Sequence, residues 1–302
     1  MSRIFDALVE AGEANGPSRL VKRRSLAVGA RRRRLYPLGG GGTSVAPPPG
    51  PTFANDDSLS WIARLTGPVT NADKLLVDDL ITVLKGIGLE KFDLVQLYCI
   101  GTTEADALLD ILGNFDAVNS GAAYTAGAHL ETNGTSSSIA SGWNPSTAGG
   151  AYGQNGGHFG AYFVDQAAVS ASGVGQFDGS DGMTIAPRQP TSNRVAFRVN
   201  QASLTSTAAG SNLDGRGLYI ANRSLSNATQ VYKNNAAIAA SGNPNQNSTA
   251  LNNAEVILGL VAGTFTAHQF SLFIAGGSLT AGEVADLYND GLLPILTAKG
   301  LV

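Results

Sequence analysis

The chain has 302 residues, a formal net charge of −3 and a charged fraction of 14%, well below the ~25% of an average globular domain. Its 43% hydrophobic content is too high for a wholly disordered protein. The single cysteine, Cys99, excludes an intramolecular disulfide and a cysteine-based zinc site. Because 38 glycines occur among many Ser, Thr and Asn residues, the composition favours a β-rich protein with long polar loops.

Most of the basic charge lies at the N-terminus. Residues 1–35 carry a net charge of +6, and the rest of the chain carries −9. Such an asymmetry is typical of a basic segment that binds an acidic surface, either a protein groove or nucleic acid, and a solvated tail without a partner is the third alternative. No aromatic residues are interleaved with the arginines, which counts against nucleic acid. The arginines expected to anchor the protein are Arg23, Arg24, Arg31, Arg32, Arg33 and Arg34.

A linker is expected over residues 39–55. Its first part reads GGGGTSVAPPPGP, a flexible glycine run followed by stiff prolines. Upstream, Asp6, Glu10 and Glu13 occupy positions where a signal peptide has an apolar core. No apolar run approaches the ~20 residues that span a bilayer. We therefore expect synthesis in a cytoplasm and no membrane contact.

Residues 56–118 are predicted to form a helical leader. Apolar side chains recur at helical spacing over 59–87, and Thr70 or Asn71 is the expected N-cap of the longer helix. The compact apolar segment 89–100 fits either a helix or a strand. This leader would therefore precede the β-rich part of the chain.

After a further short helix expected over 103–112, the pattern changes at about residue 120. Short apolar runs alternate with Gly, Asn and Ser clusters, which is typical of an antiparallel sandwich or jelly roll. Thr280 and Glu283 form a capping box that predicts a helix over 281–288. The predicted strands are 128–132, 158–164, 174–177, 183–186, 194–199, 217–222, 229–233, 236–240, 256–260 and 269–275.

Two segments near the C-terminus resemble a known superfamily. GLYIANRSLSNATQVYKNNAAI at 217–238 looks like a hairpin of the concanavalin-A-like, or laminin-G-like, jelly-roll superfamily. FSLFIAGGSLTAGEVADLY at 270–288 resembles the closing strand, turn and helix of that superfamily. Upstream, 92–112 followed by 121–145 is similar to virion proteins of tailed phages and prophages. The resemblance covers about residues 55–302.

The resemblance implies a mainly β fold, an antiparallel jelly-roll sandwich with a helical N-terminal leader and a short C-terminal helix. It implies a non-enzymatic virion structural protein, made in a host bacterium, that attaches to other virion proteins through residues 1–50. The jelly roll would project outward for host surface glycan recognition or particle decoration, as a homo-oligomer and by analogy a trimer. The expected divisions are a basic arm at 1–38, a linker at 39–55, the helical leader at 56–118 and the jelly roll at 119–302.

Two alternatives stay open. One is an inner tail-tip or baseplate component whose jelly roll binds no ligand, and the other is a glycan-active enzyme. Related jelly rolls include glucanases with an E-x-D-x-x-E motif on one strand. The nearest match here, Glu104 to Asp106, lies in a predicted helix and has Leu109 in place of the second Glu. We therefore predict no catalytic residues and no cofactor.

Candidate sugar-binding residues lie in polar segments. The stretch SGWNPSTAGGAYGQNGG surrounds two aromatic residues, and loops of this kind carry recognition on rigid sandwiches. The alternative is that both rings pack over the edge of the sandwich. Asp178 and Asp181 in DGSDG are candidate calcium ligands, but a Gly/Ser/Asp turn is the commoner meaning, and we predict no metal. The carbohydrate-binding candidates are Trp143, Asn144, Tyr152, Asn155, Asn222 and Arg223.

Overall fold

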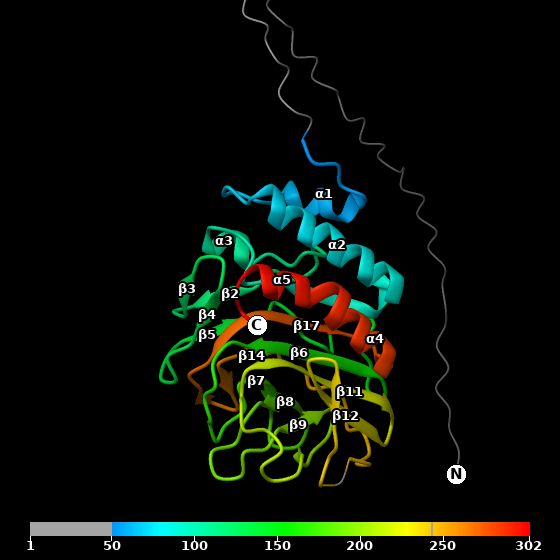
Figure 1. Cartoon of the computed structure of the whole chain (residues 1–302). Coiled ribbons are helices and arrows are strands. Elements are labelled where there is room, and N and C mark those ends of the chain that lie inside the picture. Colours follow the sequence, from blue (N-terminus) through cyan, green and yellow to red (C-terminus); the bar gives the residue numbers. More distant parts are fainter. Residues whose placement is uncertain (1–49, 243) are drawn as a thin grey trace, which may run out of the picture. The chain divides into compact units, whose positions relative to one another are not determined.

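The computed structural model describes residues 50–242 and 244–302 (Figure 1). The expected arm at 1–38 and most of the expected linker lie outside these residues. No described helix is both long enough and apolar enough to cross a membrane.

The helices come from the start and the end of the described chain. Thr70, one of the two expected N-caps, caps the longest helix by accepting a hydrogen bond from the backbone N–H of Asp73. The capping box is confirmed, because Thr280 and Glu283 each bond the other's backbone N–H. The helix continues past residue 288 through a π-helical turn. The helices are α1 (Asp56–Ile62), α2 (Asn71–Ile87), the 3₁₀ turn η1 (Leu89–Lys91), α3 (Glu104–Ala107), α4 (Ala281–Asp286), the π-helix η2 (Leu287–Leu292) and α5 (Leu293–Ala298).

Eight strands form a first antiparallel sheet, here called sheet A. Its order is β13-β12-β11-β6-β17-β4-β3, and β1 also pairs with β17. The segment 89–100, which fits either a helix or a strand by its sequence, therefore supplies a strand. The strands of sheet A are β1 (Phe92–Gln96), β3 (Ala123–Thr125), β4 (His129–Glu131), β6 (Gly157–Phe163), β11 (Gly217–Leu225), β12 (Ala228–Lys233), β13 (Ala236–Ile238) and β17 (Gln269–Gly276).

A second antiparallel sheet, sheet B, has the order β10-β9-β8-β7-β14-β5-β2. Its strands are β2 (Val118–Ser120), β5 (Ser138–Ala140), β7 (Val174–Phe177), β8 (Gly182–Ala186), β9 (Ala196–Val199), β10 (Thr205–Ser206) and β14 (Ile257–Leu258). A separate two-stranded ribbon consists of β15 (Leu260–Val261) and β16 (Thr264–Phe265).

The two sheets pack face to face, which confirms the predicted antiparallel jelly-roll sandwich. Alternate residues of both sheets fill the space between them, including Phe159 and Phe273 of sheet A and Ile185 and Phe197 of sheet B. Side chains one position away point to the opposite faces, because successive residues of a strand alternate. Each sheet therefore has an inner face and an outer face.

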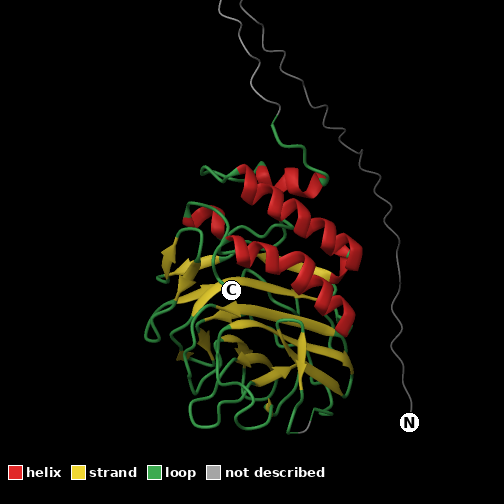
Figure 2. Ribbon diagram, viewed as in Figure 1, coloured by secondary structure: helices red, strands yellow, loops and turns green. Residues whose placement is uncertain are grey.

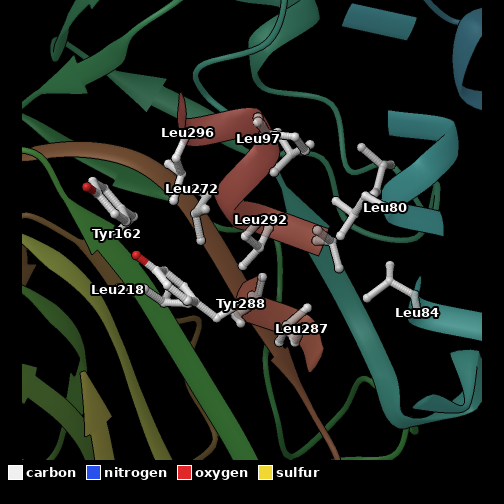
Figure 3. Packing of buried hydrophobic residues seen from close by; sticks show 14 of the residues in the cluster. Leu80, Leu84, Leu97, Tyr162, Leu218, Leu272, Leu287, Tyr288, Leu292 and Leu296 are labelled. Atoms are coloured by element: carbon white, nitrogen blue, oxygen red, sulfur yellow. The ribbon is translucent and has the colours of Figure 1, made fainter. Parts of the chain in front are cut away.

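The helices cover the outer face of sheet A (Figures 1 and 2). Leu80 and Leu84 of α2 meet Leu287 and Leu292 of the C-terminal helices, and this layer packs on sheet residues such as Leu272 (Figure 3). Sheet A thus has a hydrophobic cluster on both sides. The described helices do not lie on the outer face of sheet B (Figure 2).

Candidate functional site

The two aromatic rings predicted for sugar binding lie in the interior. The Trp143 side chain is fully buried between the sheets, and Tyr152 is only 5% exposed. Their rings meet edge to face, with centroids 5.1 Å apart. The Tyr152 hydroxyl donates a hydrogen bond of 2.9 Å to Asn200 Oδ1. The loop around them is polar, but neither ring offers a face on which a sugar could stack.

Asn222 and Arg223 of β11 also bind the chain itself. Asn222 exchanges two hydrogen bonds with the backbone of Leu279, which ties β11 to the turn before α4. Arg223 is fully buried. Its guanidinium donates to the carbonyl of Val199 at 2.7 Å and to Gln201 Oε1 at 3.0 Å, and to further carbonyls of the loops beside it. These contacts assign both side chains to holding the sandwich together.

The other two predicted sugar ligands lie nearer the surface. Asn144 donates a hydrogen bond of 3.1 Å to Asn253 Oδ1. Asn155 is exposed and accepts a hydrogen bond from the Ser248 hydroxyl. Each contacts a different part of the 244–256 loop. Within the described chain, neither side chain hydrogen-bonds to the side chains of the four interior candidates, so the six residues do not form one cluster.

The calcium candidates close the β7–β8 turn. Asp178 Oδ1 accepts hydrogen bonds from the backbone N–H groups of Ser180 and Asp181, at 2.9 and 2.8 Å. Among the described residues, no three His, Cys, Asp or Glu side chains gather as a metal site. The six N-terminal arginines predicted as anchors lie outside the described part of the chain.

A different group of residues meets on the outer face of sheet B. Met183 and Ile185 of β8 face the inter-sheet core, as do Phe197 and Val199 of β9. The residues between them, Thr184 and Arg198, therefore face outward. They are also direct cross-strand partners in the β8–β9 ladder, so their side chains are neighbours.

Phe177 of β7 completes this group. The guanidinium carbon of Arg198 lies 4.0 Å from the centre of the Phe177 ring, within the range of a cation–π contact. The residue opposite Phe177 on β8 is Gly182. A Cβ atom at Gly182 would stand 2.6 Å from Phe177 Cδ2, so a glycine is needed for the ring to lie where it does.

The β15–β16 ribbon builds a wall beside this group. Its tip contains Ala262 and Gly263, with φ angles of +50° and +75°. Such a turn suits a two-residue hairpin, but it is unfavourable for alanine. Together these elements enclose a cavity of about 250 Å³, here called the Arg198 pocket. The pocket is lined by Ser170, Ala171, Ser172, Phe177, Ala186, Gln189, Arg198, Leu204, Val261, Ala262 and Thr264.

A second cavity of about 410 Å³, here called the Thr266 pocket, adjoins the first. The two share Ser170, Ala171 and Thr264. Thr266 lines the second cavity, and its hydroxyl is buried without a hydrogen-bond partner. The Thr184 hydroxyl is likewise buried and without a partner, but Thr184 lines neither pocket. Buried polar groups are normally paired, so unpaired ones beside cavities mark places where a ligand can bind.

The Arg198 side chain is electrostatically unusual for this protein. It is half-buried, and burial lowers its pKa. It forms no hydrogen bond or ion pair with another described residue, and its Nε is shielded from solvent without an acceptor. In contrast, Arg64, Lys85, Lys91 and Lys299 each pair with a carboxylate.

Two carboxylates line a different cavity, of about 670 Å³. Glu90 and Asp93 are among its lining residues. Both oxygens of Asp93 accept backbone hydrogen bonds, from the N–H groups of Ala151 and Tyr152. Asp93 therefore anchors the 148–152 loop to β1. Glu90, the other carboxylate of this cavity, is exposed.

Sequence reasoning missed the outer-face group. The strand patterns at 174–177, 183–186 and 194–199 were sufficient to place Thr184 and Arg198 on the side opposite to the apolar residues. The strand patterns do not show that β7, β8 and β9 pair side by side, and they do not show where the β15–β16 ribbon lies. Arg198 and Phe177 are 21 residues apart in the sequence, and only the sheet brings them together.

No protein-family model matches the chain, and no curated protein matches its sequence. Among solved structures, domain 4 of an extracellular arabinanase from Geobacillus stearothermophilus, in complex with arabinotriose, is 15% identical, with a TM-score of 0.44 over 66% of this chain and 98% of that one. Trypanosoma rangeli sialidase is 12% identical, with a TM-score of 0.48 over 72% of this chain and 39% of the sialidase. The botulinum neurotoxin serotype D binding domain is 7% identical, with a TM-score of 0.44 over 66% of this chain and 51% of that one. At these identities the similarities concern the fold alone.

Proposed function

We propose that the protein is a non-enzymatic glycan-binding protein that recognises sugars through the outer face of sheet B. The observation that carries this proposal is the pair of adjoining pockets, which combine an aromatic ring, hydroxyls, an amide and an unpaired arginine. Sugar sites use this mixture, because C–H faces pack on apolar surface while hydroxyl groups need donors and acceptors.

The size of the two pockets agrees with this ligand class. The Arg198 pocket, at about 250 Å³, is slightly smaller than the ~300–1,000 Å³ of most small-molecule sites. It suits one sugar unit, and the Thr266 pocket, at about 410 Å³, suits the next unit of the same chain. A short oligosaccharide would therefore cross the shared wall formed by Ser170, Ala171 and Thr264.

We further propose that this protein belongs to a tailed-phage or phage-derived particle. The support for this is the sequence resemblance of 92–112 and 121–145 to virion proteins, together with the basic segment at 1–35. Residues 1–50 would attach the protein to other virion proteins, and the sandwich would project from the particle as a homotrimer. Several weak sugar contacts would then act together.

A glycan array with the full-length protein tests the binding proposal. Ala171 lines both pockets, so Ala171→Trp should fill the shared wall and abolish binding. Ala126 lies exposed in the β3–β4 turn, so Ala126→Trp is a matched control that should bind like the wild type. Absence of binding by the wild-type protein, or equal binding by Ala171→Trp, would contradict the proposal.

A glycan-active enzyme is the second candidate, because Glu90 and Asp93 line one cavity. Incubating the wild-type protein with every glycan that it binds, and analysing the products by mass spectrometry, separates the two functions. We expect all glycans to be recovered intact. Cleavage that is lost in Glu90→Gln would replace the binding proposal with the enzymatic one.

A further inference from the structure

We infer that the ligand of the Arg198 pocket is an acidic sugar, whose carboxylate lies against the Arg198 guanidinium. This inference rests on the proposed glycan-binding function and adds the chemical class of the sugar. Three observations lead to it: the unpaired state of Arg198, the way Phe177 holds its side chain, and the charge of the residues around the pocket.

The first observation is a contrast between two arginines. Arg223 lies fully buried, and its donors are taken up by acceptors of the chain, among them Val199 O and Gln201 Oε1. Arg198, in strand β9 of sheet B, has no such acceptor among the described residues, and its Nε is shielded from water. A half-buried cation without a partner is costly, and that cost disappears when a ligand supplies the anion.

The second observation is the orientation of the guanidinium group. Phe177 lies against one face of it, at 4.0 Å, so the group is held in place while its edge remains unpaired. A planar carboxylate binds an arginine edge through two parallel hydrogen bonds. A neutral sugar hydroxyl cannot neutralise the charge, so it would leave most of the cost in place.

The third observation is the local charge. The chain after residue 35 carries a net charge of −9, yet neither the Arg198 pocket nor the Thr266 pocket has an acidic residue in its lining. The cavity beside β1, in contrast, is lined by Glu90 and Asp93. The nearest carboxylate in the sequence, Asp178, follows Phe177 but accepts backbone hydrogen bonds within the β7–β8 turn. The linings of the two pockets therefore place no carboxylate of their own against a negatively charged ligand.

The test uses full-length protein and matched pairs of glycans. The probes are hexuronate-containing and sialylated oligosaccharides, each in its native form and after reduction of the carboxylate to a primary alcohol. The proteins are the wild type, Arg198→Gln, Arg198→Lys and a control, Lys74→Gln, which removes one positive charge from α2 on the helical layer. Thermal melting of each variant confirms that it is folded.

We expect the native acidic glycans to bind and carboxyl reduction to weaken their binding by at least about tenfold, the effect of losing a charge-assisted pair of hydrogen bonds. Arg198→Gln should lose the preference for the acidic form, Arg198→Lys should keep part of it, and Lys74→Gln should behave like the wild type. Raising the salt concentration should weaken the binding of the acidic form more than that of the reduced form.

Three results would overturn the inference, and they are distinguishable. If neutral glycans bind as tightly as acidic ones and Ala171→Trp abolishes both, the glycan-binding function stands and the acidic preference is wrong. If no glycan binds the wild type, the proposed function itself fails, and the inference fails with it. An acidic preference that is unchanged in Arg198→Gln would place the carboxylate elsewhere and would also contradict the inference.

Discussion

Arg198 of β9 reaches across β8 to lie on the ring of Phe177 of β7, with 4.0 Å between the guanidinium carbon and the ring centre. The strand between them makes this contact possible, because its residue opposite Phe177 is Gly182. The pocket therefore depends on the absence of a side chain at Gly182 as well as on the side chains of Arg198 and Phe177. This dependence leads to the first prediction.

Replacing Gly182 by alanine should damage the pocket. The new Cβ would stand 2.6 Å from Phe177 Cδ2 and 2.9 Å from Gln176 O, so the ring must move. We expect a loss of about 1–3 kcal/mol in the free energy of unfolding and weaker glycan binding. Urea unfolding and the glycan array measure these effects.

Gly86 in α2 is the matched control for that glycine. A Cβ there would meet nothing within 4 Å. Gly86→Ala should therefore stabilise the protein by about 0.5–1 kcal/mol and leave glycan binding unchanged. Wild-type stability and affinity in Gly182→Ala would show that the ring position does not matter.

The fully buried Arg223 and the half-buried Arg198 should respond differently to the same substitution. Arg223→Met removes donors from several buried carbonyls, so we expect a loss of about 2–5 kcal/mol in the free energy of unfolding. Arg198→Met removes only the contact with Phe177, so its cost should stay below about 1 kcal/mol. Chemical unfolding of both variants provides the comparison. A large loss of stability in Arg198→Met would mean that Arg198 stabilises the fold. The assignment of Arg198 to ligand binding would then lose its main argument.

The stability of the fold should fall as the pH drops from about 6.5 to 4. His158 is fully buried, and burial lowers its pKa from 6.5 to about 4. The unfolded chain therefore takes up a proton before the folded chain does, and stability present above pH 6.5 is lost towards pH 4. The shift corresponds to about 3 kcal/mol.

His158→Asn tests this assignment. Asparagine keeps a donor for the carbonyl of Gly277, which His158 Nδ1 contacts, but it does not titrate. The variant should be less stable than the wild type at pH 7, and urea unfolding at pH 7, 5.5 and 4 should show the gap narrowing by about 3 kcal/mol. Parallel stability curves for the two proteins would assign the acid sensitivity to other groups.

Deleting residues 1–49 should abolish attachment of the protein to the virion without affecting its glycan binding. The described core begins after this segment, so the truncated protein should keep its melting temperature and its glycan binding. In complementation of a phage or prophage that encodes the protein, it should be absent from purified particles. Normal incorporation of the truncated protein would contradict the proposed role of the basic segment.

Elements with strong local signals could be predicted from the sequence. The segment 174–177 is predicted to the residue, and the reciprocal bonds of Thr280 and Glu283 follow from their spacing. The expected strand at 256–260 is divided between β14 and β15, because Gly259 has a φ of +80° and breaks the run. Short polar strands such as β2 and β10 carry too little hydrophobic pattern to be recognised.

The candidate site was much less predictable. Trp143 stands in a polar loop, and only the packing of the two sheets shows that its ring is buried. Arg198 looks like an ordinary outward-facing strand residue until Phe177 and the β15–β16 ribbon are placed beside it. Both outcomes depend on contacts between distant segments, which local periodicity does not encode.

A crystal structure of the full-length protein with its tightest-binding array glycan tests the central claim most directly. We predict that the sugar occupies the Arg198 and Thr266 pockets, with its carboxylate about 3 Å from the guanidinium nitrogens of Arg198. A glycan bound elsewhere, for example beside Asn144 and Asn155 or in the cavity lined by Glu90 and Asp93, would contradict it.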